Sequence, residues 1–193
     1  MRRRRQGMGL VELLVALAIS AALLTSVAVA LDASFKAYAV NQQQAQLMQR
    51  ARLAMNRIVT QIRSTESHAP YTDTLYESFR TGHVVTDLGI QMMLDDTNGI
   101  AFYQAGTQLI RRPFKLVAGA QQWGDAHVLL EGVNAGGFTI SFQPLEGSRD
   151  PKLKRATITL TVGQSDNTTL NAEDTHADAV TLSTSIMPRK NLW

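Results

Sequence analysis

The stretch GMGLVE at residues 7–12, with the apolar run behind it, decides the fold of this chain. Four consecutive arginines, Arg2 to Arg5, precede it, and from Met8 to Leu31 nearly every residue is Leu, Val, Ala, Ile or small. About two dozen residues that rise roughly 1.5 Å each in a helix can cross a hydrocarbon core of about 30 Å. The run therefore predicts one membrane-spanning helix, and the basic cluster on its short flank predicts a cytoplasmic N-terminus.

Glu12 is the only charged side chain in the apolar run. A carboxylate at the centre of a membrane-spanning helix costs about 2.5–3.5 kcal/mol on insertion scales, and less near an interface. Ionisable residues inside a membrane usually have a partner, and the run contains no Lys, Arg or His that could pair with Glu12 within the chain. We therefore expect its partner to be a headgroup, water or a group on another molecule.

The basic leader, Gly7, and a glutamate five places later at the head of an apolar helix resemble the class III signal of type IV prepilins and type II secretion pseudopilins. The resemblance implies that a prepilin peptidase cuts between Gly7 and Met8 on the cytoplasmic side and that the new Met8 amine is methylated. It also implies that Glu12 pairs with the N-terminal amine of a neighbouring subunit. Because an α-amine has a pKa of about 8, it stays mostly cationic at neutral pH, and such a pair would favour one axial register during assembly.

An ordinary secretory signal is the alternative interpretation of the same residues. The arginines, the apolar run and the sequence AVA at residues 28–30 also fit an n-region, an h-region and an A-x-A cleavage site. Against this, the run exceeds the roughly 7–15 residues of an h-region and contains Glu12. The two interpretations differ in the mature N-terminus, which is Met8 for the prepilin and Leu31 for the secretory signal.

Length and composition set further bounds. Of the 193 residues, the leader holds four arginines, so the formal charge of +3 leaves the rest of the chain near neutral, and we infer no nucleic-acid binding. The chain has no cysteine, which excludes disulfides, thiol catalysis and Cys-ligated zinc. We predict a leader over residues 1–7, a transmembrane helix over 8–31, a periplasmic half of the same helix over 32–64, and one β-rich periplasmic domain over 65–193.

The helical pattern continues beyond the apolar run, because no Pro or Gly occurs between Leu10 and Pro70. Phe35 and Tyr38 follow the predicted span, where aromatic side chains anchor at a membrane interface. Apolar side chains then recur at spacings of three and four, which predicts a helix face covered by the downstream domain. These residues are Met48, Ala51, Met55, Ile58 and Ile62. The arginines Arg50, Arg52, Arg57 and Arg63 are expected on a solvated face or at subunit contacts.

From Ile90 the apolar period shifts to two, which predicts antiparallel strands with one buried face each. A Gly-containing loop at residues 105–107 is expected to join two of these strands as a hairpin. A turn is expected before the hairpin, formed by Asp95, Asp96, Asn98 and Gly99. Further strands are expected at residues 128–130, 138–142, 156–162 and 180–184. Residues 64–88 are expected to form a loop with one short strand that includes Tyr76 and Phe79. A charged turn at 147–154 and an exposed acidic loop at 164–178 complete the prediction.

The predicted fold class is therefore α+β, a long N-terminal helix packed against an antiparallel β-sheet domain. Residues 99–112 resemble the hairpin of J-type minor pseudopilins and PilW-type minor pilins. Residues 132–142, the strand start at 154–158 and the tail near residues 188–191 follow the same plan. The resemblance implies a minor subunit of a pilin-like fibre.

No enzyme motif is present. The chain lacks a G-x-S-x-G elbow, a phosphate-binding glycine loop and H-E-x-x-H. Its four histidines are scattered without ligand spacing, and we expect each to be an exposed loop residue. They are His68, His83, His127 and His176. Asp95, Asp96 and Asn98 could offer oxygens to calcium, but the sequence is also that of an ordinary turn, so we predict no metal and no cofactor.

The expected function is that of a minor pilin or pseudopilin that primes or caps assembly of a type IV pilus or type II secretion pseudopilus. Its expected partners are other pilins or pseudopilins, a prepilin peptidase, the inner-membrane assembly platform and membrane lipid. Small residues on the first helix permit close helix approach; they are Ala16, Ala18, Ser20, Ala21 and Ala22. The alternative is a membrane-anchored or secreted periplasmic enzyme or binding domain.

Overall fold

The computed structural model describes residues 9–145, 152–163 and 179–189. The chain divides into two units, residues 1–45 and 46–193. The leader, the predicted loop at 164–178 and most of the predicted turn at 147–154 lie outside the described residues.

The first element is α1 (Leu10–Ser64), a single helix of 55 residues that belongs to the first unit as far as residue 45. Residues 9–39 are all exposed, including every Leu, Val and Ile of the apolar run. With no Pro or Gly to interrupt it, the helix ends where it was predicted to end, at Ser64. The prediction of one continuous helix is therefore confirmed.

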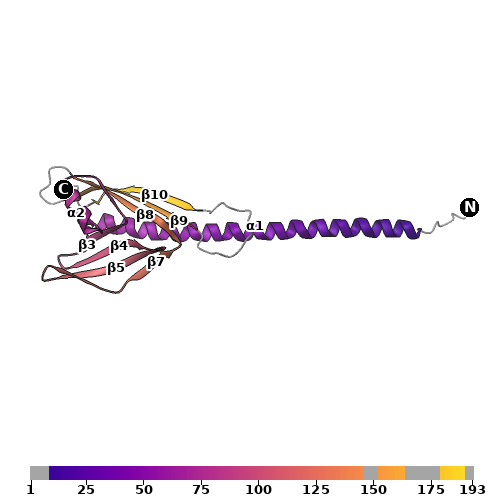
Figure 1. The fold of residues 1–193 in the computed structure, drawn as a ribbon, viewed down its shortest axis with the longest axis horizontal. Coiled ribbons are helices and arrows are strands. Elements are labelled where there is room, and N and C mark those ends of the chain that lie inside the picture. Colours follow the sequence, from indigo (N-terminus) through magenta and orange to yellow (C-terminus); the bar gives the residue numbers. More distant parts are fainter. Residues whose placement is uncertain (1–8, 146–151, 164–178, 190–193) are drawn as a thin grey trace, which may run out of the picture. The chain divides into compact units, whose positions relative to one another are not determined.

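The second unit contains two antiparallel sheets (Figure 1). The first has the order β1 (Ser67–Pro70), β3 (Gly89–Met93), β4 (Asn98–Ala105), β5 (Gln108–Val117) and β6 (Ala120–Trp123), with β7 (His127–Glu131) also paired to β5. The second has the order β10 (Val180–Ile186), β9 (Leu153–Val162), β8 (Val133–Pro144) and β2 (Val85–Asp87). In Figure 1, β3, β4, β5 and β7 are drawn on one side of the last turns of α1 and β10 on the other.

One hydrophobic core joins both sheets to the last turns of α1. Ala51, Ile58 and Ile62 are completely buried, and Phe138, Ile140 and Phe142 of β8 are as well. The predicted helix face and the predicted alternation of the strands are therefore confirmed, although Met48 is only partly buried. Fully burying one such side chain contributes about 1.5–3 kcal/mol, so this shared core holds the second unit together without disulfides.

The side chain of Gln104 connects β4 of the first sheet to β8 of the second. Its Nε2 donates to the carbonyls of Gly106 at 2.8 Å and Asn134 at 2.7 Å, and its Oε1 accepts a hydrogen bond from the Phe138 N–H at 3.0 Å. Asn134 and Phe138 lie where the β8–β9 register shifts, between Val133 and Phe138, and Gly106 lies in the β4–β5 turn. The amide thus satisfies backbone groups that the irregular ladder leaves without strand partners.

The segment between α1 and the sheets differs from its prediction. Residues 64–88 contain two strands, β1 and β2, and the helix α2 (Asp73–Arg80), which includes both Tyr76 and Phe79. The prediction of a loop with one strand missed α2, because Phe79 is the one buried side chain of that helix. Its ring packs against Phe142 at a centroid separation of 5.8 Å. One buried side chain in eight residues gives no helical period.

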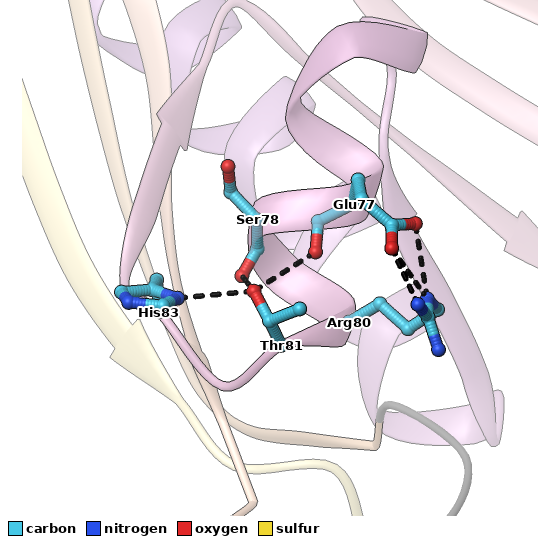
Figure 2. Close-up of polar contacts among 5 residues, drawn as sticks. All are labelled: Glu77, Ser78, Arg80, Thr81 and His83. Carbon is cyan, nitrogen blue, oxygen red and sulfur yellow. Dashed lines mark hydrogen bonds and ion pairs between the residues drawn. The ribbon is translucent and has the colours of Figure 1, made fainter.

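The C-terminus of α2 is capped by the side chain of Thr81, the residue that follows the helix, as Figure 2 shows. The Thr81 hydroxyl lies 3.1 Å from the Glu77 carbonyl, 3.0 Å from the Ser78 carbonyl and 3.0 Å from His83 Nδ1. Arg80 forms an exposed ion pair with Glu77 one turn earlier. These local contacts satisfy carbonyls at the end of a short helix, where the intrahelical ladder cannot.

Candidate processing and assembly segment

Glu12 lies in the first turn of α1, where its carboxylate reaches back to the backbone that precedes the helix. The Leu13 N–H donates to the Gly9 carbonyl at 3.1 Å, which opens the helix. In return, Glu12 Oε2 accepts a hydrogen bond from the Gly9 N–H at 3.2 Å. Gly9 therefore occupies the N-cap position and Glu12 the third helical position, where a capping box places glutamate. The positive end of the helix dipole also favours a carboxylate there.

Two hydroxyl groups further along the apolar run are satisfied within the helix. Thr25 Oγ1 donates to the Ala21 carbonyl and Ser26 Oγ to the Leu23 carbonyl, both at 2.8 Å. In hydrocarbon an unsatisfied polar group is costly, and these intrahelical bonds remove that cost. Neither hydroxyl needs an outside partner, so Glu12 is the side chain of this segment whose charge still calls for a counter-charge.

A charged pair and two aromatic side chains follow the apolar run. Lys36 Nζ lies 2.8 Å from Asp32 Oδ2, one helical turn away, and both side chains are exposed. Phe35 and Tyr38 are each 69% exposed. Charges and aromatic rings in this order are typical of the place where a membrane-spanning helix leaves the lipid. The helix is long and apolar enough to cross a membrane.

Two of the three predicted site residues, Gly7 and Met8, lie outside the described residues. The cleavage between them and the methylation of Met8 stay predictions. The pairing of Glu12 with a neighbouring amine is a prediction as well, because its contact in the structure is with Gly9 of the same chain.

Residues 2–28 match the family model described as the prokaryotic N-terminal methylation motif. The chain carries a type IV prepilin-like N-terminus. The match includes Glu12 and most of the apolar run, and it supports the pilin superfamily. Neither the curated proteins nor the solved structures contain a significant match to the chain.

The motif indicates a type IV pilin-like protein, and together with the exposed apolar helix it favours anchoring in a membrane. Proteins with this motif assemble with other pilins and are processed by a prepilin peptidase. The motif also favours a structural subunit over an enzyme. The architecture agrees, since a long N-terminal helix followed by an antiparallel β-domain is pilin-like.

His68 is buried, which corrects the prediction that every histidine is an exposed loop residue. It lies in β1 with 2% of its surface exposed, and its Nε2 is 2.8 Å from Thr65 Oγ1 and 3.1 Å from the Ile62 carbonyl. Burial lowers the pKa of His68 to about 4, so the ring is neutral at pH 7. His83 is exposed in a loop as predicted. His127 is exposed but begins strand β7, so its prediction as a loop residue was wrong, and His176 lies outside the described residues.

The acidic turn before β4 is organised around Asp95. Its Oδ1 accepts hydrogen bonds from the backbone N–H groups of Thr97 at 2.9 Å and Asn98 at 2.7 Å, and Asn98 Nδ2 donates to Oδ2 at 2.8 Å. The Asn98 side chain, followed by these backbone donors, holds the pKa of Asp95 well below its usual range. Within the described ranges, no three His, Cys, Asp or Glu side chains gather as metal ligands. The carboxylate of Asp95 serves the turn.

Two features of the second unit could not be predicted from the sequence. The first is an aromatic cluster in which Tyr71 stacks on Tyr103 at 4.3 Å and meets Trp123 edge-on at 6.2 Å. Phe114 and Trp123 border a hollow of about 560 Å³ beside Gly99. The second is a hollow lined by Arg63, Arg155 and Arg189. Both combine side chains from elements that are far apart along the chain, so spacing alone does not reveal them.

Proposed function

We propose that this chain is a minor pilin or pseudopilin, a structural subunit that primes or caps a type IV pilus or a type II secretion pseudopilus after prepilin peptidase cleavage. The observation that carries the proposal is the methylation motif at residues 2–28, which includes Glu12 and continues into an apolar helix. That helix is exposed on all sides from residue 9 to residue 39. A helix that is apolar all round needs lipid or other helices around it.

In this proposal the first helix has two successive environments. It anchors the protein in the inner membrane as a single span over residues 8–31, with a cytoplasmic N-terminus and a periplasmic domain over residues 65–193. It then packs among the helices of other subunits in the fibre, where its small side chains allow close approach. Residues 32–64 form the periplasmic half of the helix, whose last turns belong to the core of the second unit.

Cleavage between Gly7 and Met8 supplies the counter-charge that Glu12 lacks within the chain. The new Met8 amine keeps its positive charge when methylated. A Glu12 carboxylate that meets this amine on a neighbouring subunit satisfies both charges in one register, whereas other registers leave a carboxylate unpaired in an apolar environment.

The processing step is tested by expressing the full chain with and without a prepilin peptidase and measuring the intact mass and the N-terminal sequence. We expect peptidase-dependent loss of residues 1–7 and a product that begins at methylated Met8. A product that begins at Leu31 would instead support the ordinary secretory signal and refute the proposal.

The assembly step is tested with Glu12→Val, and with Asp32→Val as the matched control. Both substitutions remove one carboxylate from the same exposed helix, but Asp32 already pairs with Lys36 in the same chain. We expect Glu12→Val to lower the number of copies in sheared fibres at least about tenfold, since an unpaired buried amine would remain. Asp32→Val should incorporate normally. Wild-type incorporation of Glu12→Val would refute the role of Glu12 in register.

A further inference from the structure

Three arginines from distant parts of the chain line one hollow in the second unit, which we name the arginine hollow. Arg63 comes from the last turn of α1, Arg155 from β9, and Arg189 follows β10. Ser185 and Met187 also line the hollow, which has a volume of about 570 Å³. All three arginines are exposed, so their guanidinium groups are available to a ligand.

Each arginine is held in place by a buried neighbour in the chain. Ile62, which precedes Arg63, and Ala156, which follows Arg155, are completely buried. Pro188, which precedes Arg189, is buried as well. The pairing of Ala156 with Ile186 brings the start of β9 beside the end of β10. The backbone positions of the three cations are therefore set by the core, and their convergence is a property of the fold.

The arginine hollow carries three positive charges from the described residues that line it. Among the residues that the structure describes, no Asp or Glu is part of this lining. Two ion pairs found among the described residues, Lys36 with Asp32 and Arg80 with Glu77, involve none of the residues that line the hollow. Three like charges around one concavity repel one another and attract anions.

We propose that the arginine hollow binds a carboxylate-rich segment of another protein subunit. A guanidinium group is planar and presents paired N–H donors that match a carboxylate, so three of them in one hollow suit several carboxylates on one segment. Met187, which is 50% exposed, offers an apolar contact beside them. None of the described residues that line the hollow has an aromatic side chain on which a base could stack, which disfavours single-stranded nucleic acid. This contact is separate from the helix packing that involves Glu12.

The test uses the full chain in zwitterionic detergent and a fluorescent hexaglutamate peptide, with binding measured by anisotropy at low salt. The variant Arg63→Gln/Arg155→Gln/Arg189→Gln should bind about tenfold more weakly, because each exposed charge pair contributes only modestly. The matched control Arg50→Gln/Arg52→Gln/Arg57→Gln removes the same charge from exposed positions of α1 outside the hollow and should bind like wild type. Raising the salt should weaken the wild-type binding.

A charge-reversed variant makes the test independent of any loss of folding. The variant Arg63→Glu/Arg155→Glu/Arg189→Glu should abolish hexaglutamate binding and create binding of hexalysine. Equal weakening in the hollow variant and the matched control would overturn the proposal, as would the absence of wild-type binding. Inorganic phosphate that displaces the peptide at equal concentration would also overturn it, since the hollow would then be a site for small anions.

Discussion

Replacing His68 with Gln should remove most of the pH dependence of stability between pH 5 and pH 7. The pKa of His68 falls from 6.5 to about 4 on folding because the ring is buried. Between these values the unfolded chain binds a proton that the folded chain does not, so the free energy of unfolding rises with pH across this window. Protonation of His68 should lower that free energy by about 2 kcal/mol at pH 5 relative to pH 7, and by about 3 kcal/mol in total below pH 4.

Urea unfolding of the full chain in neutral detergent at pH 7, 6 and 5 measures this effect, with Trp fluorescence as the signal. Trp123 reports on the second unit because it contacts Phe114 and Tyr71. His68→Gln should lower stability at pH 7 but leave a flat profile from pH 7 to pH 5. His83→Gln, which removes an exposed histidine, is the matched control and should keep the wild-type slope.

If the free energy of unfolding of His68→Gln fell between pH 7 and pH 5 as much as that of wild type, the reasoning would be refuted. The proton taken up on unfolding would then bind to a residue other than His68. The stability measurements stop at pH 5 because a second group, Asp95, affects stability at lower pH. The pKa of Asp95 is also lowered in the folded chain, so its stabilising effect is lost only as the pH falls below its ordinary value of 3.8. The two groups therefore act in the same direction but over different ranges of pH.

Two further substitutions test the packing of the second unit, both by thermal unfolding of the full chain. Gln104→Ala should lower the free energy of unfolding by about 2–3 kcal/mol because three hydrogen bonds are lost, two of which join the sheets. A wild-type melting temperature for Gln104→Ala would mean that these hydrogen bonds contribute nothing. Gly99→Ala should destabilise by about 1–3 kcal/mol because its Cβ would lie 2.1 Å from Phe114 Cζ, and the effect should shrink when Phe114→Leu is already present. Equal effects of Gly99→Ala in both backgrounds would contradict the predicted clash.

The long helix and most strands could be predicted from sequence because their apolar residues repeat with the period of the element. Ala51, Ile58 and Ile62 follow the helical spacing, and Phe138 and Ile140 alternate across β8. The start of β8 could not be placed, because it begins at Val133 and passes through an irregular register at Gly136 and Gly137 before the alternation begins. A bulged segment lacks the period-two pattern on which the prediction depends.

The errors have a common physical origin. Tyr76 and Phe79 have the aromatic side chains that strands favour, yet α2 forms because burial of Phe79 against Phe142 outweighs local preference. His68 looks like a surface residue in sequence, but its neighbours in the register of β1 bring it beside Thr65 and the end of α1. Both outcomes also depend on residues far apart in the chain, because Phe79 packs against Phe142 and His68 pairs with Met92 in the β1–β3 register. Sequence spacing contains no information about those contacts.

The candidate segment was the part of the molecule most readily predicted, because it depends on local order along one helix. Glu12, the apolar run and the basic leader are contiguous, and they coincide with the motif at residues 2–28. The arginine hollow was not predictable, since Arg63, Arg155 and Arg189 meet only after β9 and β10 have paired. Arg63 alone was expected on a solvated face or at a subunit contact.

The hydrogen bond between the Gly9 N–H and Glu12 has a consequence for a subunit that waits alone in the bilayer. Its carboxylate already accepts a hydrogen bond from its own backbone but has no counter-charge, so the proposed pairing with a neighbour's amine would add a charge pair to a group that is partly stabilised. The free energy released by that pairing would then be smaller than the cost of a bare charge in lipid. In the proposed fibre, a subunit that binds in the wrong register could therefore dissociate before later subunits bind and hold it in place.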